Sequence, residues 1–265
     1  MNTTETAAIP GLKVTCQDGV AVVTLDRPSR RNALDDELEA ALRATLHRQA
    51  QDPQVRVIVL TGAGGSFCAG KDLRSAPAGA APAEVSGRIE EHRFAFLTRI
   101  PKPVIALVDG AAAGIGLMLA LYCDLRIAST RALFTTAFSR RGLIAEHGSA
   151  WLLPRMVGLG HAADLLLTAR PVSACDALRM GLVNQVVEPE TLEATGWLLA
   201  KEMAQQISPR SMREIKRQLW RDLETRFDEA LRLAEADQGA CLDSEDAREG
   251  LLAFKQRRTP RFSGA

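Results

Sequence analysis

The stretch KPVIALVDGAAAGIGLMLALYCD, Lys102 to Asp124, decides the fold class of this chain. Apart from Lys102, residues 102–108 are apolar and partly β-branched, which predicts a short buried strand. A glycine-rich loop follows, and residues 114–123 are then apolar on all sides, which favours a buried helix. A buried strand that runs through glycines into a buried helix indicates an α/β fold with parallel strands.

A similar unit precedes this one. VRVIVL, Val55 to Leu60, also predicts a buried strand, and it runs into the glycine-rich loop TGAGGSFCAG, Thr61 to Gly70. In an α/β sheet the carboxyl ends of parallel strands converge on the ligand site. Two such loops could offer two backbone N–H groups to one oxygen atom, which is the geometry of an oxyanion hole. The alternative is that both loops are merely tight turns.

The remaining segments extend the α/β pattern. Val20 to Leu25 predicts a strand, and leucines spaced by four residues from Leu34 to Leu46 predict a helix. A further helix is expected over residues 84–99. Two short strands are expected at residues 125–128 and 132–135.

From residue 148 onward the chain is expected to be mostly helical. Ser173 with Asp176 resembles a capping box, Gly181 suits the position after a helix end, and Ser208 precedes a proline in the manner of an N-cap. We expect a core of residues 1–200 that carries the substrate site, followed by a helical C-terminal region of residues 201–265.

Composition excludes several classes of protein. The 265 residues are 46% hydrophobic, and their net charge of +1 disfavours a general nucleic-acid binder. The odd count of five cysteines, without a CxxC motif, predicts a reducing compartment, and neither disulfides nor a metal site is expected. The N-terminal segment does not read as a signal peptide, and no apolar run reaches the ~18 residues of a membrane span. We therefore expect a cytoplasmic protein.

Two features near the first loop suggest functions that the sequence does not support. GSFCAGKD, Gly65 to Asp72, nearly matches a phosphate-binding loop, but Asp72 replaces the hydroxyl that would hold magnesium. A nucleotide triphosphatase is therefore disfavoured. Cys68 could act as a nucleophile, but the sequence places no base beside it, so a small packed residue is the favoured interpretation.

Six segments in order resemble one known family, the crotonase superfamily of enoyl-CoA hydratases and isomerases: DRPSRRNAL, SFCAGKDL, PKPVIALVDGAAAGIGLMLALYCDLRIA, GLIAEHGSAWLLPRMVG, ARPVSACDALRMGLVNQVV and DAREGLLAFKQRRTPRF. The resemblance implies an α/β fold, a crotonase-like spiral of ββα units with a helical C-terminal trimerisation region. It also implies acyl-CoA thioester substrates, homotrimers or hexamers of paired trimers, and an oxyanion hole for a thioester enolate. Coenzyme A is then part of the substrate, and no separate cofactor is expected.

The resemblance places the two oxyanion amides on Ala69 and Ile115. The second position is commonly glycine in the family, but a backbone N–H is available from any residue except proline. Ile115 lies near the start of the predicted helix, whose N-terminus adds positive potential where the enolate oxygen would form.

The catalytic acids are where this sequence departs from the hydratases. The two glutamates that hold water in those enzymes fall on Met118 and Phe138, which cannot transfer a proton. Glu146 lies eight residues beyond Phe138, in a stretch similar to the acid-bearing segment of single-acid isomerases, and we predict it to be the single catalytic acid and base. Its apolar flank is expected to shield it from water. The alternative is a glutamate at a helix N-cap or first turn.

The resemblance therefore favours isomerisation of the double bond of an enoyl-CoA. Hydration of an enoyl-CoA and a catalytically degenerate acyl-CoA-binding protein remain alternatives. The loop from Ser75 to Glu84 is expected to be mobile and to shape the acyl pocket, and Asp124 is expected to be structural. The groups expected to bind coenzyme A, each of which could instead be an ordinary surface or loop residue, are Arg30, Arg31, Cys68, Ala69, Lys255 and Arg257.

Overall fold

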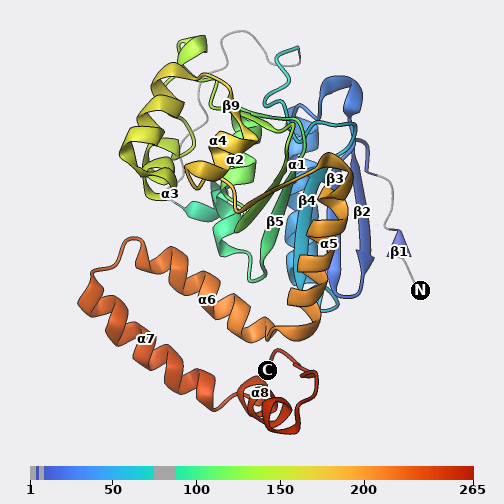
Figure 1. Ribbon diagram of the computed structural model, residues 1–265, viewed down its shortest axis with the longest axis vertical. Helices are drawn as coiled ribbons and strands as arrows, with labels where there is room; N and C mark the ends of the chain where they lie inside the picture. Colours follow the sequence, from blue (N-terminus) through green and yellow to red (C-terminus); the bar gives the residue numbers. More distant parts are fainter. Residues whose placement is uncertain (1–3, 6–8, 75–87) are drawn as a thin grey trace.

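A mixed sheet of seven strands forms the centre of the computed structural model, which describes residues 4–5, 9–74 and 88–265 (Figure 1). The strand order is β1-β2-β3-β4-β5-β7-β10; β1, β2 and β3 pair antiparallel, and the others pair parallel. A second sheet has the order β6-β8-β9. The strands are β1 Thr4–Glu5, β2 Leu12–Gln17, β3 Val20–Leu25, β4 Val57–Gly62, β5 Val104–Val108, β6 Ala111–Ala113, β7 Leu125–Ser129, β8 Leu133–Thr135, β9 Val172–Ser173 and β10 Gln185–Val187.

Helices cover both faces of the large sheet and form the C-terminal part of the chain (Figure 1). Several single-turn 3-10 segments join them. The α-helices are α1 Asp36–Gln51, α2 Ile115–Leu121, α3 Ser149–Ala163, α4 Ala174–Arg179, α5 Pro189–Gln206, α6 Pro209–Asp222, α7 Phe227–Leu242 and α8 Glu245–Gln256.

Strand β4 shows how the sequence buries both faces of the sheet. Ile58 and Leu60 pack into the cluster that holds α1 and α2, while Val57 and Val59 pack toward α5. Alternate residues of a strand point to opposite faces, so a strand covered on both sides must be apolar throughout. This explains the uninterrupted apolar runs of β4 and β5.

Most of the predicted elements are confirmed. The strand at Val20–Leu25 has the predicted bounds, and Ser173 and Ser208 are N-caps whose hydroxyls accept backbone N–H groups. Residues 84–87 of the helix expected over 84–99 lie outside the described residues, and the rest is wrong in type, because residues 89–91 and 95–99 form separate 3-10 turns. The loop expected at Ser75–Glu84 lies outside the described residues.

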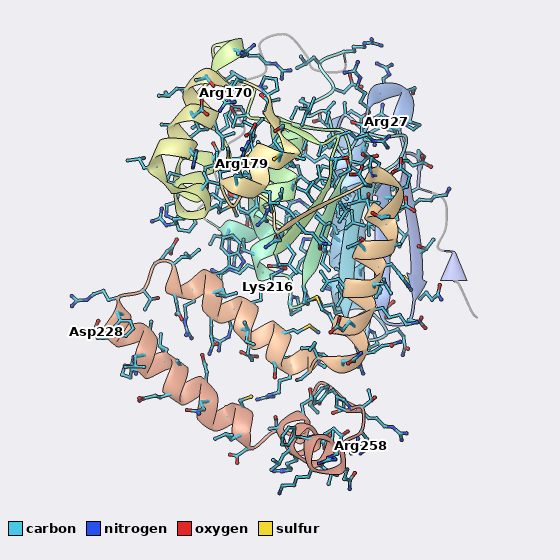
Figure 2. The ribbon with its side chains drawn as sticks, in the orientation of Figure 1. Arg27, Arg170, Arg179, Lys216, Asp228 and Arg258 are labelled. Carbon is cyan, nitrogen blue, oxygen red and sulfur yellow. The ribbon has the colours of Figure 1, made fainter. Side chains whose placement is uncertain are left out.

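The C-terminal helices α6 to α8 lie below the sheet in Figure 1. The predicted division at residue 200 falls inside α5, which packs on the sheet through Ala200 and Ala204. Lys216 on α6 ties this region to the core, because its Nζ donates to Oδ2 of Asp124 at 2.7 Å (Figure 2). Asp124 also accepts the Val104 N–H at 2.7 Å, so its expected structural role is confirmed.

The five cysteines are all free thiols. The described residues contain no cluster of His, Cys, Asp and Glu side chains suited to a metal ion. In the same part of the chain, none of the helices has the length and apolar character needed to cross a membrane.

Candidate active site

The two glycine-rich loops lie side by side at the carboxyl edge of the sheet. Strands β4 and β5 pair in parallel, with Ile58 opposite Val104, so their following loops leave the same edge. Cys68 then joins the loops, because its N–H donates to the Ala111 carbonyl at 2.9 Å and its carbonyl accepts the Ala113 N–H at 3.0 Å. The predicted convergence of the two loops is confirmed.

Glycines permit the close approach of these loops. A Cβ atom at Gly116 would lie 2.2 Å from the Cys68 carbonyl oxygen. A Cβ atom at Gly70 would lie 2.8 Å from the Ala113 oxygen and 3.8 Å from the Ile115 nitrogen. The backbone at Gly70 therefore lies next to the amide of Ile115, which begins α2.

The Ile115 amide has no acceptor within its own helix. The Met118 N–H donates to the Gly114 carbonyl at 3.1 Å, so the N–H groups of residues 115–117 precede the hydrogen-bonded ladder. Orphan amides of this kind are satisfied by water, side chains or a ligand.

The Ala69 amide, predicted as an oxyanion donor, already has an acceptor within the chain. Its N–H donates to the Arg31 carbonyl at 3.0 Å and cannot serve a substrate at the same time. The following residues pair with Leu34, because the Leu34 N–H donates to Gly70 and the Asp72 N–H donates to Leu34, both at 2.8 Å. Successive groups of an extended chain alternate in direction, so the Lys71 N–H points away from Leu34. The Lys71 amide, two residues after the predicted donor, is therefore not used in this pairing.

Cys68 is a packing residue, as the favoured interpretation held. Its side chain is fully buried, and burial raises the pKa of its thiol to about 12, with the carboxylate of Glu39 adding to the rise. A thiol with so high a pKa is not a nucleophile near neutral pH.

The two positions where the resemblance places the hydratase glutamates lie in the apolar core. Met118 is fully buried on α2, and Phe138 is 4% exposed. These two positions therefore offer neither a carboxylate nor a site for a polarised water.

Glu146 lies in the turn before α3, with 37% of its side chain exposed. The helix begins at Ser149 after the N-cap Gly148, so Glu146 is neither an N-cap nor a first-turn residue. The expected shielding by the flank is wrong, because Leu143 and Ile144 are themselves exposed. In this chain the carboxylate faces partly toward water.

Tyr122 and Arg93 hold the residue next to Glu146, and neither was predicted from the sequence. The Tyr122 hydroxyl donates to the His147 carbonyl at 2.7 Å, and Nη1 of Arg93 lies 3.3 Å from Nε2 of His147. Tyr122 is the single tyrosine of the chain and ends an apolar helix, which was a usable signal, whereas nothing in the sequence marks Arg93.

A cavity of ≈ 410 Å³ adjoins these residues. Its lining combines aromatic, imidazole and guanidinium groups: His92, Arg93, Phe94, Ala95, Tyr122, His147 and Gly148. Burial, and then the positive charge of Arg93, lowers the pKa of His147 to about 4. His147 is therefore neutral near pH 7, and it lies 3.8 Å from Oε2 of Glu146.

The predicted coenzyme A groups separate into two regions. Arg30 and Arg31 are exposed close to the first loop, where Arg30 lies 3.8 Å from Asp72. Lys71 is a further cation there and pairs with Asp36. Cys68 uses its backbone N–H and carbonyl to join the loops, whereas Ala69 is partly exposed.

Lys255 and Arg257 lie at or just after the end of α8, away from the loops of their own chain (Figure 1). The C-terminal segment packs at the amino edge of the sheet, where Arg56, just before β4, donates to the Phe262 carbonyl at 2.7 Å. The loops leave the carboxyl edge. These two cations can therefore reach a ligand at the loops only from another copy of the chain.

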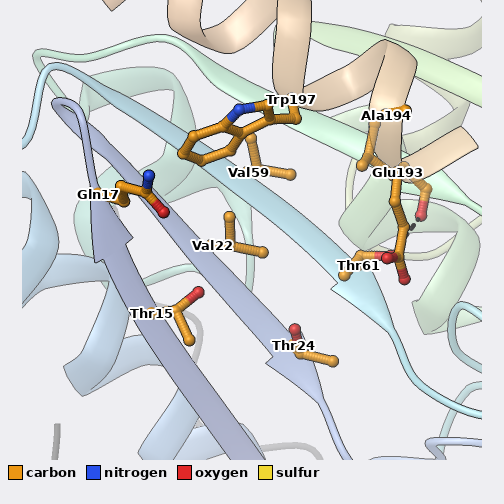
Figure 3. A pocket seen from close by; sticks show the side chains of 10 residues that line it. Thr15, Gln17, Val22, Thr24, Val59, Thr61, Glu193, Ala194 and Trp197 are labelled. Atoms are coloured by element: carbon orange, nitrogen blue, oxygen red, sulfur yellow. Dashed lines mark hydrogen bonds between the residues drawn. The ribbon is translucent and has the colours of Figure 1, made fainter. Parts of the chain in front are cut away.

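A second cavity, of ≈ 490 Å³, lies on the face of the sheet that α5 covers (Figure 3). Threonines of three neighbouring strands, Thr15, Thr24 and Thr61, line it together with Trp197 and Glu193 of α5. Apart from Thr61, which is still part of β4, its walls include no residue of the glycine-rich loops, and they do not include Glu146. It is thus separate from the candidate active site.

Comparison with known proteins assigns the family. Residues 15–265 match the sequence model of the family described as Enoyl-CoA hydratase/isomerase. The chain belongs to this family. It is therefore an enzyme of the crotonase type that acts on coenzyme A thioesters, and the predicted fold class is confirmed.

Individual relatives cover nearly the whole chain. A 1,2-epoxyphenylacetyl-CoA isomerase of Escherichia coli is 40% identical over 94% of this chain and 96% of its own length. A (E)-benzylidenesuccinyl-CoA hydratase of Thauera aromatica is 37% identical over 93% and 96%. A crystal structure of a probable enoyl-CoA hydratase/isomerase from Mycobacterium abscessus superposes with a TM-score of 0.87 at 36% identity, covering 96% of this chain and 99% of that one.

Proposed function

We propose that this enzyme moves the double bond of an enoyl-CoA thioester, with Glu146 as the single proton carrier. One observation carries the choice of reaction: buried apolar side chains, Met118 and Phe138, stand at both positions where the resemblance places the water-holding glutamates of the hydratases. The similarity to a coenzyme A isomerase at 40% identity supports it. Glu146 is then the carboxylate available for proton transfer.

The backbone amides of Lys71 and Ile115 would stabilise the intermediate. A thioester carbonyl placed between them becomes an enolate oxygen when a neighbouring C–H bond breaks, and preorganised N–H groups stabilise the charge that forms. The Glu146 carboxylate takes that proton, the electron pair enters the dienolate, and the resulting carboxylic acid returns the proton two carbons away. Reactant and product have the same atoms, and water takes no part.

Substrate binding would supply the shielding that the flank of Glu146 lacks. An acyl group in the adjoining cavity would displace water from the carboxylate and strengthen its interaction with the substrate. Arg30, Arg31 and Lys71 would meet the phosphates of coenzyme A near the first loop. Lys255 and Arg257 would reach the same ligand from a second copy.

The C-terminal helices support a trimer or a pair of trimers. Within the chain α7 buries none of its side chains, and apolar residues are exposed along α6 to α8: Ile215, Leu219, Leu223, Phe227, Leu231, Leu242, Leu251, Leu252 and Phe254. Association of copies would remove this surface from water. Sedimentation equilibrium should give three or six times the 28.6 kDa mass of the chain. The five free thiols support a reducing, cytoplasmic setting.

The test of the reaction is turnover of 2-enoyl, 3-enoyl and aryl coenzyme A esters in H₂¹⁸O. Isomerisation predicts a shifted double bond and no label in the product. A product that carries ¹⁸O would instead establish hydration, the activity named for the Thauera aromatica relative. Binding of the esters without turnover of any of them would favour an acyl-CoA-binding protein that has lost catalysis.

A further inference from the structure

A line of charged and polar groups leads from α1 to Glu146. Oε1 of Glu39 accepts a hydrogen bond from Nε of Arg93 at 2.7 Å. The other end of that guanidinium lies 3.3 Å from Nε2 of His147, and Glu146 lies beyond. Glu146, the acid that the proposed function needs, thus lies next to the imidazole of His147. That imidazole lies next to the fixed guanidinium of Arg93.

The chemistry of the guanidinium decides the tautomer of His147. Arginine has five N–H donors and no acceptor, so Nε2 of His147 must accept the hydrogen bond. The ring proton is then on Nδ1, and the ring carries no charge. An imidazolium would place a proton on Nε2, facing the N–H of Arg93. This would break the hydrogen bond and add repulsion between two like charges.

Two charged neighbours of His147 have opposite effects on the charge of its ring. Arg93, from the segment before β5, disfavours a positive ring, whereas Glu146, on the same turn, favours one at 3.8 Å. Tyr122 holds the backbone carbonyl of His147, and His92 lines the same cavity. Loss of the Arg93 charge would therefore leave Glu146 as the charged partner of the ring.

We propose that Arg93 is a positioning residue that acts together with burial to keep His147 neutral and extends this neutral state to more acidic pH, so that Glu146 is not paired with an imidazolium and its carboxylate is available to accept the substrate proton. Glu39 anchors the guanidinium for this role. This inference rests on the proposed function of Glu146. It assigns His147 the part of a neutral hydrogen-bonding neighbour rather than a second acid.

Titration of the histidine rings by NMR tests the inference without any substrate. Arg93→Met should raise the pKa of His147 by about one unit, since a cation and its hydrogen bond are lost and the Glu146 charge remains. His147→Gln identifies the signal. Arg99→Met is the matched control, because it removes an exposed arginine of the neighbouring 3-10 turn and should leave the titration in place. Arg93→Gln keeps an N–H donor but no charge, and it serves as the second variant if Arg93→Met does not fold.

The dependence of kcat/KM on pH then connects the titration to catalysis. In Arg93→Met, kcat/KM should show a new decrease on the acid side of the pH profile, at the pH where His147 becomes charged. The double variant Arg93→Met with His147→Gln should not show this decrease. Arg93→Lys should restore most of the wild-type profile, because it returns the charge. An unchanged His147 titration in both Arg93→Met and Arg93→Gln would overturn the inference. If the titration moves as expected but Glu146→Gln is fully active, the proposed function fails instead.

Discussion

Two parts of the site are built by different means. The amide cluster, residues 68–71 and 111–116, consists of backbone groups that glycines allow to pack closely. The acid cluster, Arg93, Tyr122, Glu146 and His147, depends on side chains: Arg93 and Tyr122 form hydrogen bonds to His147 beside a cavity, and Glu146 lies 3.8 Å from the His147 ring. The first can accept isoleucine where the family commonly has glycine, because only a peptide N–H is needed. The second depends on the identity of each side chain.

The largest effect should come from the acid cluster. Glu146→Gln keeps the shape of the side chain but removes its basicity, and we expect kcat to fall at least ~100-fold with similar affinity for the coenzyme A ester. Steady-state kinetics together with calorimetric binding measures both quantities. Glu235→Gln, at an exposed position of α7, is the matched control. A Glu146→Gln enzyme with full activity would show that the acid cluster is not the proton carrier.

The amide cluster should be sensitive to spacing rather than to charge. Gly116→Ala would put a Cβ atom 2.2 Å from the Cys68 oxygen, so α2 must move away from the first loop. We expect an unfolding free energy lower by about 1–3 kcal/mol and a kcat lower by roughly 10-fold, since the Ile115 amide moves with the helix. Thermal unfolding and kinetics give the two values.

Gly160→Ala is the control for this change, because a Cβ atom there meets nothing within 4 Å. Its stability should stay within about 1 kcal/mol of the wild type. Wild-type kcat in a folded Gly116→Ala enzyme would contradict the assignment of the Ile115 amide.

The acid cluster should also make the stability of the protein depend on pH. The pKa of His147 is lowered to about 4, so between about pH 6.5 and pH 4 the unfolded chain binds a proton that the folded chain does not. The free energy of unfolding therefore falls as the pH falls through this window. His147→Gln should remove about 2 kcal/mol of that loss. Urea unfolding at pH 7 and pH 4.5 measures it, with the exposed His161→Gln as control; equal losses in the two variants would contradict the prediction.

The smallest effect should come from Tyr122, whose hydroxyl holds the turn that precedes α3. Tyr122→Phe removes the hydrogen bond to the His147 carbonyl, which should cost about 1 kcal/mol of stability. We expect kcat to fall a few-fold while KM changes little, because the turn that carries Glu146 loosens. A lower melting temperature with unchanged kcat would assign Tyr122 to stability alone.

The fold was largely predictable because its signals are local. The apolar runs of β4 and β5, the leucine spacing of α1 and the serine caps of α4 and α6 each specify one element within a short window. The prediction of one helix over 84–99 was wrong in type. Its apolar residues suit a helix, whereas residues 89–91 and 95–99 form two separate 3-10 turns.

The sequence by itself determined the two glycine-rich loops, the loss of both hydratase glutamates and the choice of Glu146, since each depends only on which residue stands at which place. Tertiary structure alone decided which amides remain available. A peptide N–H serves one acceptor at a time. The Arg31 carbonyl, 38 residues away, accepts the N–H of Ala69, whereas the N–H of Lys71 stays available. It also decided the environment of Glu146, because Arg93 and Tyr122 reach its neighbour from distant parts of the chain. Such contacts form only when the sheet and its helices have brought those segments together.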